Sequence, residues 1–237
     1  MSTETHEHQG PAYLQHHFHT PVQQFSAAKL GMWAFLSQEV LFFSGLFVAY
    51  GIFRSWYPEA FSVASHLLDW KMGGINTCVL LLSSFTAAMS VRSAQKGTQN
   101  QTSMWIVLTI LFALGFMVIK YFEYAHKFHV GFAPGEYFAP SPEGMEEISH
   151  AMQSVNHLSL SAPPPEIRSF FGIYFMMTGV HGIHVLIGIF VFIWMLVRNV
   201  RGEFSPEFFT PVDLAALYWH LVDLIWIYLF PLLYLID

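Results

Sequence analysis

Ionisable side chains interrupt the long apolar runs of this sequence, and Glu39 is the clearest case. It lies about 12 residues, or roughly 18 Å, into an apolar stretch, which would be mid-membrane in a spanning helix. A charged side chain at that depth costs about 2.5 to 3.5 kcal/mol, so it requires a reason. Two readings are open: a carboxyl that exchanges protons or gates a path, and a protonated acid that hydrogen-bonds to a neighbouring helix.

Two other apolar runs contain histidines that could bind a metal or a haem. His181 and His184 are three residues apart, so a helix would place them on one face. His220 could supply the second axial ligand of a bis-histidine haem, and its spacing from Asp223 suits a proton relay. Helix packing is the alternative for all four residues, because neutral histidines bond across helices where small residues let backbones approach. The sequence favours packing, and it predicts no metal site.

Three further polar residues fall in or beside apolar runs. Asn76 is typical of a side chain that hydrogen-bonds between helices. Lys120 and Glu123 are three apart near a helix end, which predicts an ion pair in which Lys120 extends toward the membrane surface.

The N-terminal tail is polar and rich in histidine. These side chains are irregularly spaced, which favours a solvated segment over a metal site; they are His6, His8, His16, His17 and His19.

Five apolar segments are long enough to position these residues in a bilayer. A hydrocarbon core of about 30 Å needs about 20 apolar residues in a helix, because every backbone polar group must be bonded internally. The predicted spans are approximately Ala27 to Phe53, Met72 to Val91, Met104 to Phe122, Phe170 to Val197, and Leu214 to Ile236. The predicted fold class is all-α: an integral membrane bundle of five transmembrane helices.

Composition supports a membrane protein and excludes other classes. Of the 237 residues, 54% are hydrophobic and only 11% are charged, against roughly a quarter charged in soluble domains. The net charge of −6 excludes the basic surface that nucleic-acid binding requires. A single cysteine, Cys78, excludes an internal disulfide or a thiolate metal site built from this chain alone.

The chain is expected to contain one membrane domain, residues 27–237, after a polar tail at 1–26 without a cleaved targeting segment. The connection at about 124–169 is expected to be an external acidic lobe without an amphipathic period. An odd number of spans places the termini on opposite sides. Basic residues in short loops favour an N-terminus inside and a C-terminus outside; they are Lys29, Arg92, Lys96, Arg198 and Arg201.

Several of these features follow one another in an order that resembles a known family. The runs are Lys29–Met32, Ser37–Gly45, Asn76–Thr77, Glu123–Tyr124, Thr178–Val185 and Tyr218–Asp223. In this order they closely resemble subunit III of haem-copper cytochrome c oxidases, across all five predicted spans. The glutamate in a phenylalanine-rich run, the HGIHV segment and the YWHLVD segment together make the resemblance specific.

The resemblance implies the five-helix bacterial form, which lacks the first two helices of the longer seven-helix form. It implies a subunit of the aerobic respiratory chain, in the bacterial plasma membrane, without a catalytic centre of its own. Haem and copper are then expected in the partner subunits I and II. The chain would pack mainly on subunit I, stabilise the oxygen-reducing, proton-pumping core and support proton uptake.

The same resemblance implies phospholipid headgroups at His19, Lys29 and Arg198. An arginine at a helix end can bind phosphate bidentately, whereas a lysine acts as a point charge. The alternative is that these residues are plain anchors at the inner surface. The acidic lobe would suit a basic cytochrome or another respiratory complex.

Two other functions stay open from the sequence. A membrane cytochrome would use His181 or His184 together with His220. A proton or solute carrier centred on Glu39 is disfavoured, because the chain has no internal repeat.

Overall fold

The structure, a computed structural model, describes residues 13–155 and 162–236. In this part of the chain the regular elements are helices, and five of them are long and apolar enough to cross a membrane. The prediction of an all-α bundle of five transmembrane helices is confirmed. The spanning helices are α1 (Pro21–Trp56), α3 (Trp70–Gln95), α4 (Gln99–His129), α6 (Ile167–Val200) and α7 (Thr210–Tyr234).

Capping residues and polar end turns extend α1 beyond its apolar run. It begins at Pro21 rather than near Ala27, since Thr20 is the N-cap and accepts a hydrogen bond from the Gln23 backbone N–H. With 36 residues it is about 54 Å long, which exceeds the roughly 30 Å hydrocarbon core. Its end turns therefore lie at headgroup level or beyond.

Residues 21–26 of the predicted polar tail form the first turns of α1. His16, His17 and His19 are exposed. His6 and His8 lie outside the described residues.

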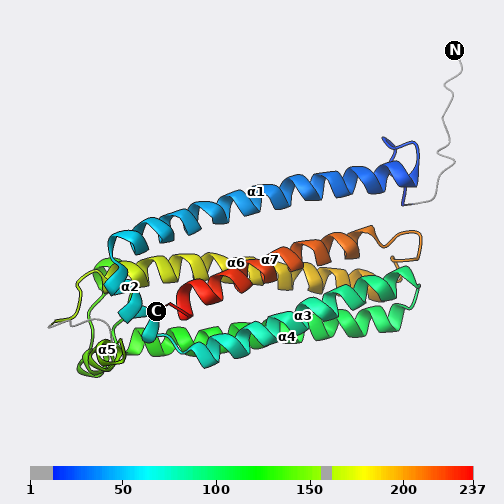
Figure 1. Cartoon of the computed structure of the whole chain (residues 1–237). Coiled ribbons are helices and arrows are strands. Elements are labelled where there is room, and N and C mark those ends of the chain that lie inside the picture. The colour runs from blue at the N-terminus through cyan, green and yellow to red at the C-terminus, as the bar shows by residue number, and fades with distance from the viewer. Residues whose placement is uncertain (1–12, 156–161, 237) are drawn as a thin grey trace, which may run out of the picture.

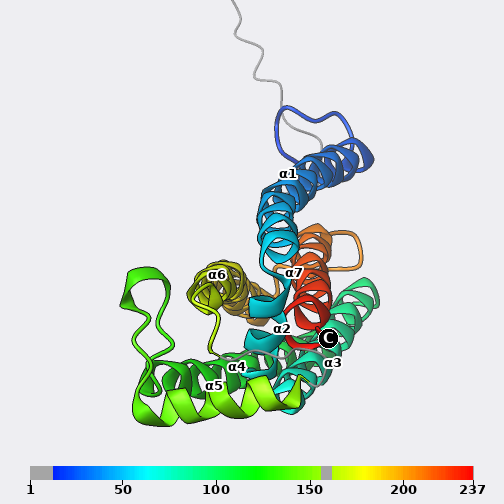
Figure 2. The ribbon, with the colours of Figure 1, turned by 60° about the vertical axis from the view of Figure 1, so that its left-hand side comes forward.

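Four of the spanning helices form a closed bundle. α3 packs on α4, α4 on α6, α6 on α7, and α7 on α3 (Figures 1 and 2). α1 runs along one side of this bundle and packs on α6 and α7. Its buried residues, Leu36, Phe43 and Tyr50, are seven apart and form a single seam. Most of the α1 surface consequently faces away from the rest of the chain.

The two ends of the bundle differ in their connections. At one end, here called the turn end, short links follow α3 and α6, and Gly97 and Gly202 adopt positive φ of 71° and 76°. Glycine accepts this left-handed conformation without strain, so it ends each helix sharply. At the other end, the loop end, lie two short helices. α1 begins at the turn end and α7 finishes near the loop end (Figure 1).

The short helices at the loop end are α2 (Pro58–His66) and α5 (Pro142–Ser154), accompanied by a 3-10 turn, η1 (Gly135–Tyr137). The prediction that 124–169 lacks amphipathic structure is wrong. Ser141 caps α5 by accepting from the Gly144 N–H, and α5 buries Gly144, Ile148 and Ala151 on one face. Two of those three residues are small, so a search for large apolar side chains misses the face.

Candidate functional site

A carboxyl–imidazole contact joins α1 to α6 about halfway along α1. Glu39 Oε2 lies 3.0 Å from His184 Nε2, and the two side chains are 12% and 16% exposed. Phe43, one turn after Glu39, packs edge-on against the His184 ring with 5.2 Å between centroids. Glu39 is therefore bonded to a neighbouring helix, with His184 as its partner.

The hydrogen bonds of His184 define how many protons the pair holds. Nδ1 lies 2.9 Å from the Val180 carbonyl oxygen, which can only accept, so Nδ1 carries a hydrogen. The contact between Nε2 and the carboxyl then needs one shared proton, held by the carboxylic acid or by an imidazolium. Either way the pair has no net charge, which reduces its cost in hydrocarbon.

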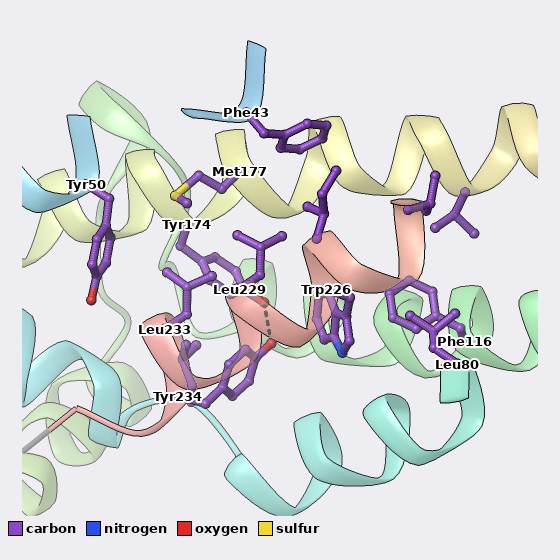
Figure 3. Close-up of a cluster of buried hydrophobic side chains, with 14 of the residues drawn as sticks. Phe43, Tyr50, Leu80, Phe116, Tyr174, Met177, Trp226, Leu229, Leu233 and Tyr234 are labelled. Carbon is purple, nitrogen blue, oxygen red and sulfur yellow. Dashed lines mark hydrogen bonds between the residues drawn. The ribbon is translucent and has the colours of Figure 1, made fainter. Parts of the chain in front are cut away.

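A second polar cluster joins α4, α6 and α7 toward the loop end. Lys120 Nζ donates to Glu123 Oε2 at 2.9 Å, to the Tyr174 hydroxyl at 3.1 Å and to the Tyr234 hydroxyl at 3.0 Å. Both tyrosines in turn donate to Glu123 Oε1. In Figure 3 the hydroxyls of Tyr174 and Tyr234 point toward each other from α6 and α7. All three ammonium donors and both carboxylate oxygens are thus satisfied.

The predicted Lys120–Glu123 ion pair is present, but the prediction that Lys120 extends toward the membrane surface is wrong. Its ammonium lies 5.1 Å from the Trp226 ring centroid and 5.2 Å from that of Tyr124, and the residue is buried. Snorkelling is favoured when a charge lacks partners in the interior. Here the carboxylate, the hydroxyls and the aromatic faces supply them.

Between these clusters lie three buried polar side chains of the bundle core. Asn76 on α3, His181 on α6 and Asp223 on α7 are each at most 3% exposed. Within residues 13–155 and 162–236 their side chains make no hydrogen bonds. The inter-helix bond expected of Asn76 is therefore not formed to a described residue.

The predicted pair of His220 and Asp223 is not formed either. His220 Nδ1 instead lies 2.7 Å from the Ser84 hydroxyl of α3. His220 therefore connects α7 to α3, while Asp223 is buried within the bundle.

The histidine geometry does not suit axial haem ligation. Both ring nitrogens of His184 are engaged, by Val180 and by Glu39. His181 is enclosed between the rings of Phe116 and Trp226, at 5.5 and 5.2 Å. An axial ligand needs a free nitrogen facing room for the macrocycle, which neither residue provides. The described residues also contain no group of three or more His, Cys, Asp or Glu side chains positioned to hold a metal.

An apolar groove of about 500 Å³ lies between α1, α6 and α7 in the turn-end half. Met32 and Phe35 of α1 face Trp194 of α6 and Tyr218 of α7 across it, and Arg198 lines its polar end. Arg198 Nε donates to Glu203 at 2.6 Å. The guanidinium also stacks on Trp194, at 5.0 Å.

The other residues expected at phospholipid headgroups lie at the same end. Lys29 forms an ion pair with Asp213 at 3.0 Å and does not line the groove. His19 is exposed just before α1, where its backbone N–H donates to the Gln23 side chain.

Sequence reasoning missed the tyrosines and the serine that complete these contacts. Tyr174 and Tyr234 complete the Lys120 cluster, and Ser84 holds His220. Tyrosine and serine are common in apolar helices, so their presence does not indicate a polar contact. Such a contact can be recognised only once it is known which helices pack together. Helical spacing could have flagged Tyr174, since it lies seven residues before His181 on one face of α6.

The chain is similar to known oxidase subunits along most of its length. A sequence model of the family "Cytochrome c oxidase subunit III" matches residues 161–237. A probable cytochrome c oxidase subunit 3 of Nocardia farcinica is 31% identical over 212 residues, which are 87% of each chain. A cytochrome c oxidase subunit 3 of Corynebacterium diphtheriae is 31% identical over 88% of this chain and 87% of its own.

Relatives named for another electron donor are also similar. A quinol oxidase subunit 3 of Bacillus subtilis is 28% identical over 208 residues, covering 88% of this chain and 86% of its own. The five apolar helices and these relatives indicate a multi-pass bacterial membrane protein. Because the identity passes 30% over nearly the full length of a relative, the chain belongs to the cytochrome c oxidase subunit III family, within the haem-copper oxidases.

Proposed function

We propose that the chain is the non-catalytic subunit III of a bacterial haem-copper oxidase, packed mainly on subunit I with subunit II nearby. In this role it stabilises the oxygen-reducing, proton-pumping core and supports proton uptake. Haem and copper are carried by the partner subunits. The N-terminus is inside and the C-terminus outside, in agreement with the basic residues of the short turn-end loops.

One observation carries this proposal: the clearest ionisable groups inside the membrane are bonded to one another. Glu39 is bonded to His184, and Lys120 to Glu123 and two tyrosines. A carrier or a catalytic site instead exposes ionisable groups to a substrate or to a water-filled path. These contacts join helices, which is what a stabilising subunit requires.

Phospholipid binding is the second part of the proposal. The groove between α1, α6 and α7 is apolar along its length and ends at Arg198, which suits an acyl chain below an anionic headgroup. Glu203 accepts from Nε, and so the terminal nitrogens of Arg198 can contact a phosphate. Lys29 and His19 lie at the same end and would contribute to the positive surface around the headgroup.

The loop end is the third part of the proposal, as a surface for a partner protein. Three α5 glutamates contact histidines, namely Glu143 with His129, Glu146 with His150 and Glu147 with His126. The surface that α5 forms at the loop end is rich in carboxylates. It therefore suits a basic cytochrome or a neighbouring respiratory complex.

The decisive experiment replaces Glu39 by alanine in the whole oxidase. The haem and copper content of the complex should not change, because this chain supplies no ligand. Retention of subunit III during purification should fall, or inactivation during turnover should accelerate, because α1 loses its bond to α6. Glu136→Ala, at an exposed glutamate of η1, is the matched control. Loss of metal centres in Glu39→Ala alone would contradict the proposal.

A further inference from the structure

At the loop end, a cavity of about 560 Å³ opens between α2, the start of α3, α4 and α5. These elements gather at one end of the molecule in both views (Figures 1 and 2). Its lining is divided by polarity. Its charged side chains are Lys127 and three carboxylates, and Leu68, Met72 and Phe122 contribute apolar surface. Two of the carboxylates are already bonded, Asp69 as the N-cap of α3 and Glu123 to Lys120, which leaves Glu147 to face Lys127. The cavity is separate from the groove at Arg198, which lies in the turn-end half.

The charged part of the cavity is built around Lys127. This residue is 4% exposed, and its Nζ donates to the Leu67 carbonyl oxygen at 2.6 Å. Its distance of 3.8 Å to Glu147 Oε2 is too long for a hydrogen bond. An ammonium has three N–H donors, so Lys127 can also donate to a ligand.

Glu147 supplies the opposite charge and keeps acceptor capacity. One of its oxygens, Oε1, lies 3.0 Å from His126 Nε2. The other, Oε2, faces Lys127. A carboxylate has about four lone-pair sites, which leaves room for an ammonium donor from a ligand.

The cavity lies at the depth of lipid headgroups. The apolar part of α4, Met104 to Phe122, is about 28 Å long, so the turns that carry Glu123 to Lys127 emerge from the hydrocarbon core. Trp70, at the start of α3, is 57% exposed, as is typical of an interfacial aromatic residue. Phe122 is 61% exposed and would contact the upper part of an acyl chain.

We propose that this cavity binds the headgroup of a zwitterionic phospholipid of the phosphoethanolamine class. Lys127 holds the phosphate, Glu147 accepts from the ammonium, and the acyl chains leave past Met72 and Phe122. A headgroup of purely negative charge would leave Glu147 facing an anion. A choline headgroup could not donate a hydrogen bond to Glu147.

The test uses the purified oxidase complex containing the full chain. The complex is stripped of lipid and equilibrated with vesicles of equal parts phosphatidylethanolamine and phosphatidylglycerol. It is then re-extracted in mild detergent, and each lipid per complex is counted by mass spectrometry. Glu147→Gln should retain one phosphatidylethanolamine fewer and bind it roughly tenfold more weakly, with phosphatidylglycerol unchanged. Its neighbour Glu146→Gln is the matched control, since that side chain is 74% exposed and does not line the cavity.

A second variant and two soluble probes complete the test. Lys127→Gln should lose the same lipid, whereas Arg198→Ala should affect only the groove, which separates failure of this site from failure of the groove. Equal retention by Glu147→Gln and the wild type would overturn the proposal. So would equal loss of both lipids. Displacement of the lipid by inorganic phosphate or by zinc ions, in the wild type and in Glu146→Gln alike, would also overturn it, because the site would then prefer a free anion or a metal ion.

Discussion

Glu39 and His184 are 145 positions apart in the chain, yet their side chains are 3.0 Å apart between α1 and α6. α1 otherwise meets the bundle along a single seam of Leu36, Phe43 and Tyr50. Two further polar contacts secure its ends, Lys29 with Asp213 and the Tyr50 hydroxyl with the Leu232 carbonyl oxygen. Since the seam is narrow, the contact between Glu39 and His184 is the polar bond that holds the middle of α1.

A double-mutant cycle should reveal this bond as a coupling energy. Glu39→Leu and His184→Leu should each destabilise the protein, and the double variant should lose less than the sum by about 1 to 2 kcal/mol. The measurement is unfolding in mixed detergent micelles, followed by circular dichroism. Glu39→Leu combined with His220→Leu is the control pair, because His220 bonds to Ser84 of α3. Additive effects of Glu39 and His184 would mean that the contact does not stabilise the fold.

A hydrophobic carbodiimide should distinguish the two glutamates of the spanning helices, Glu39 on α1 and Glu123 on α4. The reagent enters from lipid and attacks protonated carboxyl groups. Glu39 is 12% exposed and shares one proton with His184, so it should react. Glu123 is 3% exposed and is held by Lys120 and two tyrosines, so it should not. Peptide mapping of the modified chain would read out the site. Modification of Glu123, or equal modification of the loop glutamates, would contradict this geometry.

The spanning helices were predictable because the length of an apolar run can be read directly from the sequence. Single polar residues such as Glu39 were recognised in the same way, since each interrupts such a run. The Lys120–Glu123 pair was predictable too, since its partners are three positions apart. Pairing Glu39 with His184 requires knowing that α1 packs on α6, which no local pattern contains. The same limit applies to Ser84 of α3, which bonds to His220 in place of Asp223, three positions later in the chain. Helix α5 was missed because a glycine and an alanine form much of its buried face.

A close helix crossing at Gly188 should be intolerant of any side chain. A Cβ atom there would overlap the Trp219 ring, and Trp219 is buried with its Nε1 donating to Ser83. Gly188→Ala should therefore destabilise the protein by about 1 to 3 kcal/mol. Gly182→Ala is the control on the same helix, because open space surrounds its Cβ position. Equal thermal stability of the two variants would show that α6 and α7 can separate at Gly188 without cost.

Arg198 should determine how much phospholipid the groove retains. Arg198→Ala removes the guanidinium at the polar end of the groove, so the complex should keep less anionic phospholipid after detergent extraction. Arg201→Ala is the control, because Arg201 is exposed at the end of the same helix and does not line the groove. Lipid counting by mass spectrometry is the measurement. Identical lipid content in both variants would favour plain anchoring of the helix end.

Substituting Lys120 alone should destabilise the protein, and substituting Glu123 as well should restore part of that stability. Lys120→Met leaves the Glu123 carboxylate without its cation, and breaking a buried pair in this way costs about 3 to 5 kcal/mol. Adding Glu123→Gln removes the uncompensated charge, so the double variant should recover part of the lost stability. Lys71→Met, at an exposed lysine at the start of α3, is the control for loss of a lysine. Thermal unfolding of the purified chain in detergent measures all three. If the double variant is less stable than Lys120→Met, then Tyr174 and Tyr234 depend on the Glu123 carboxylate more than on charge balance.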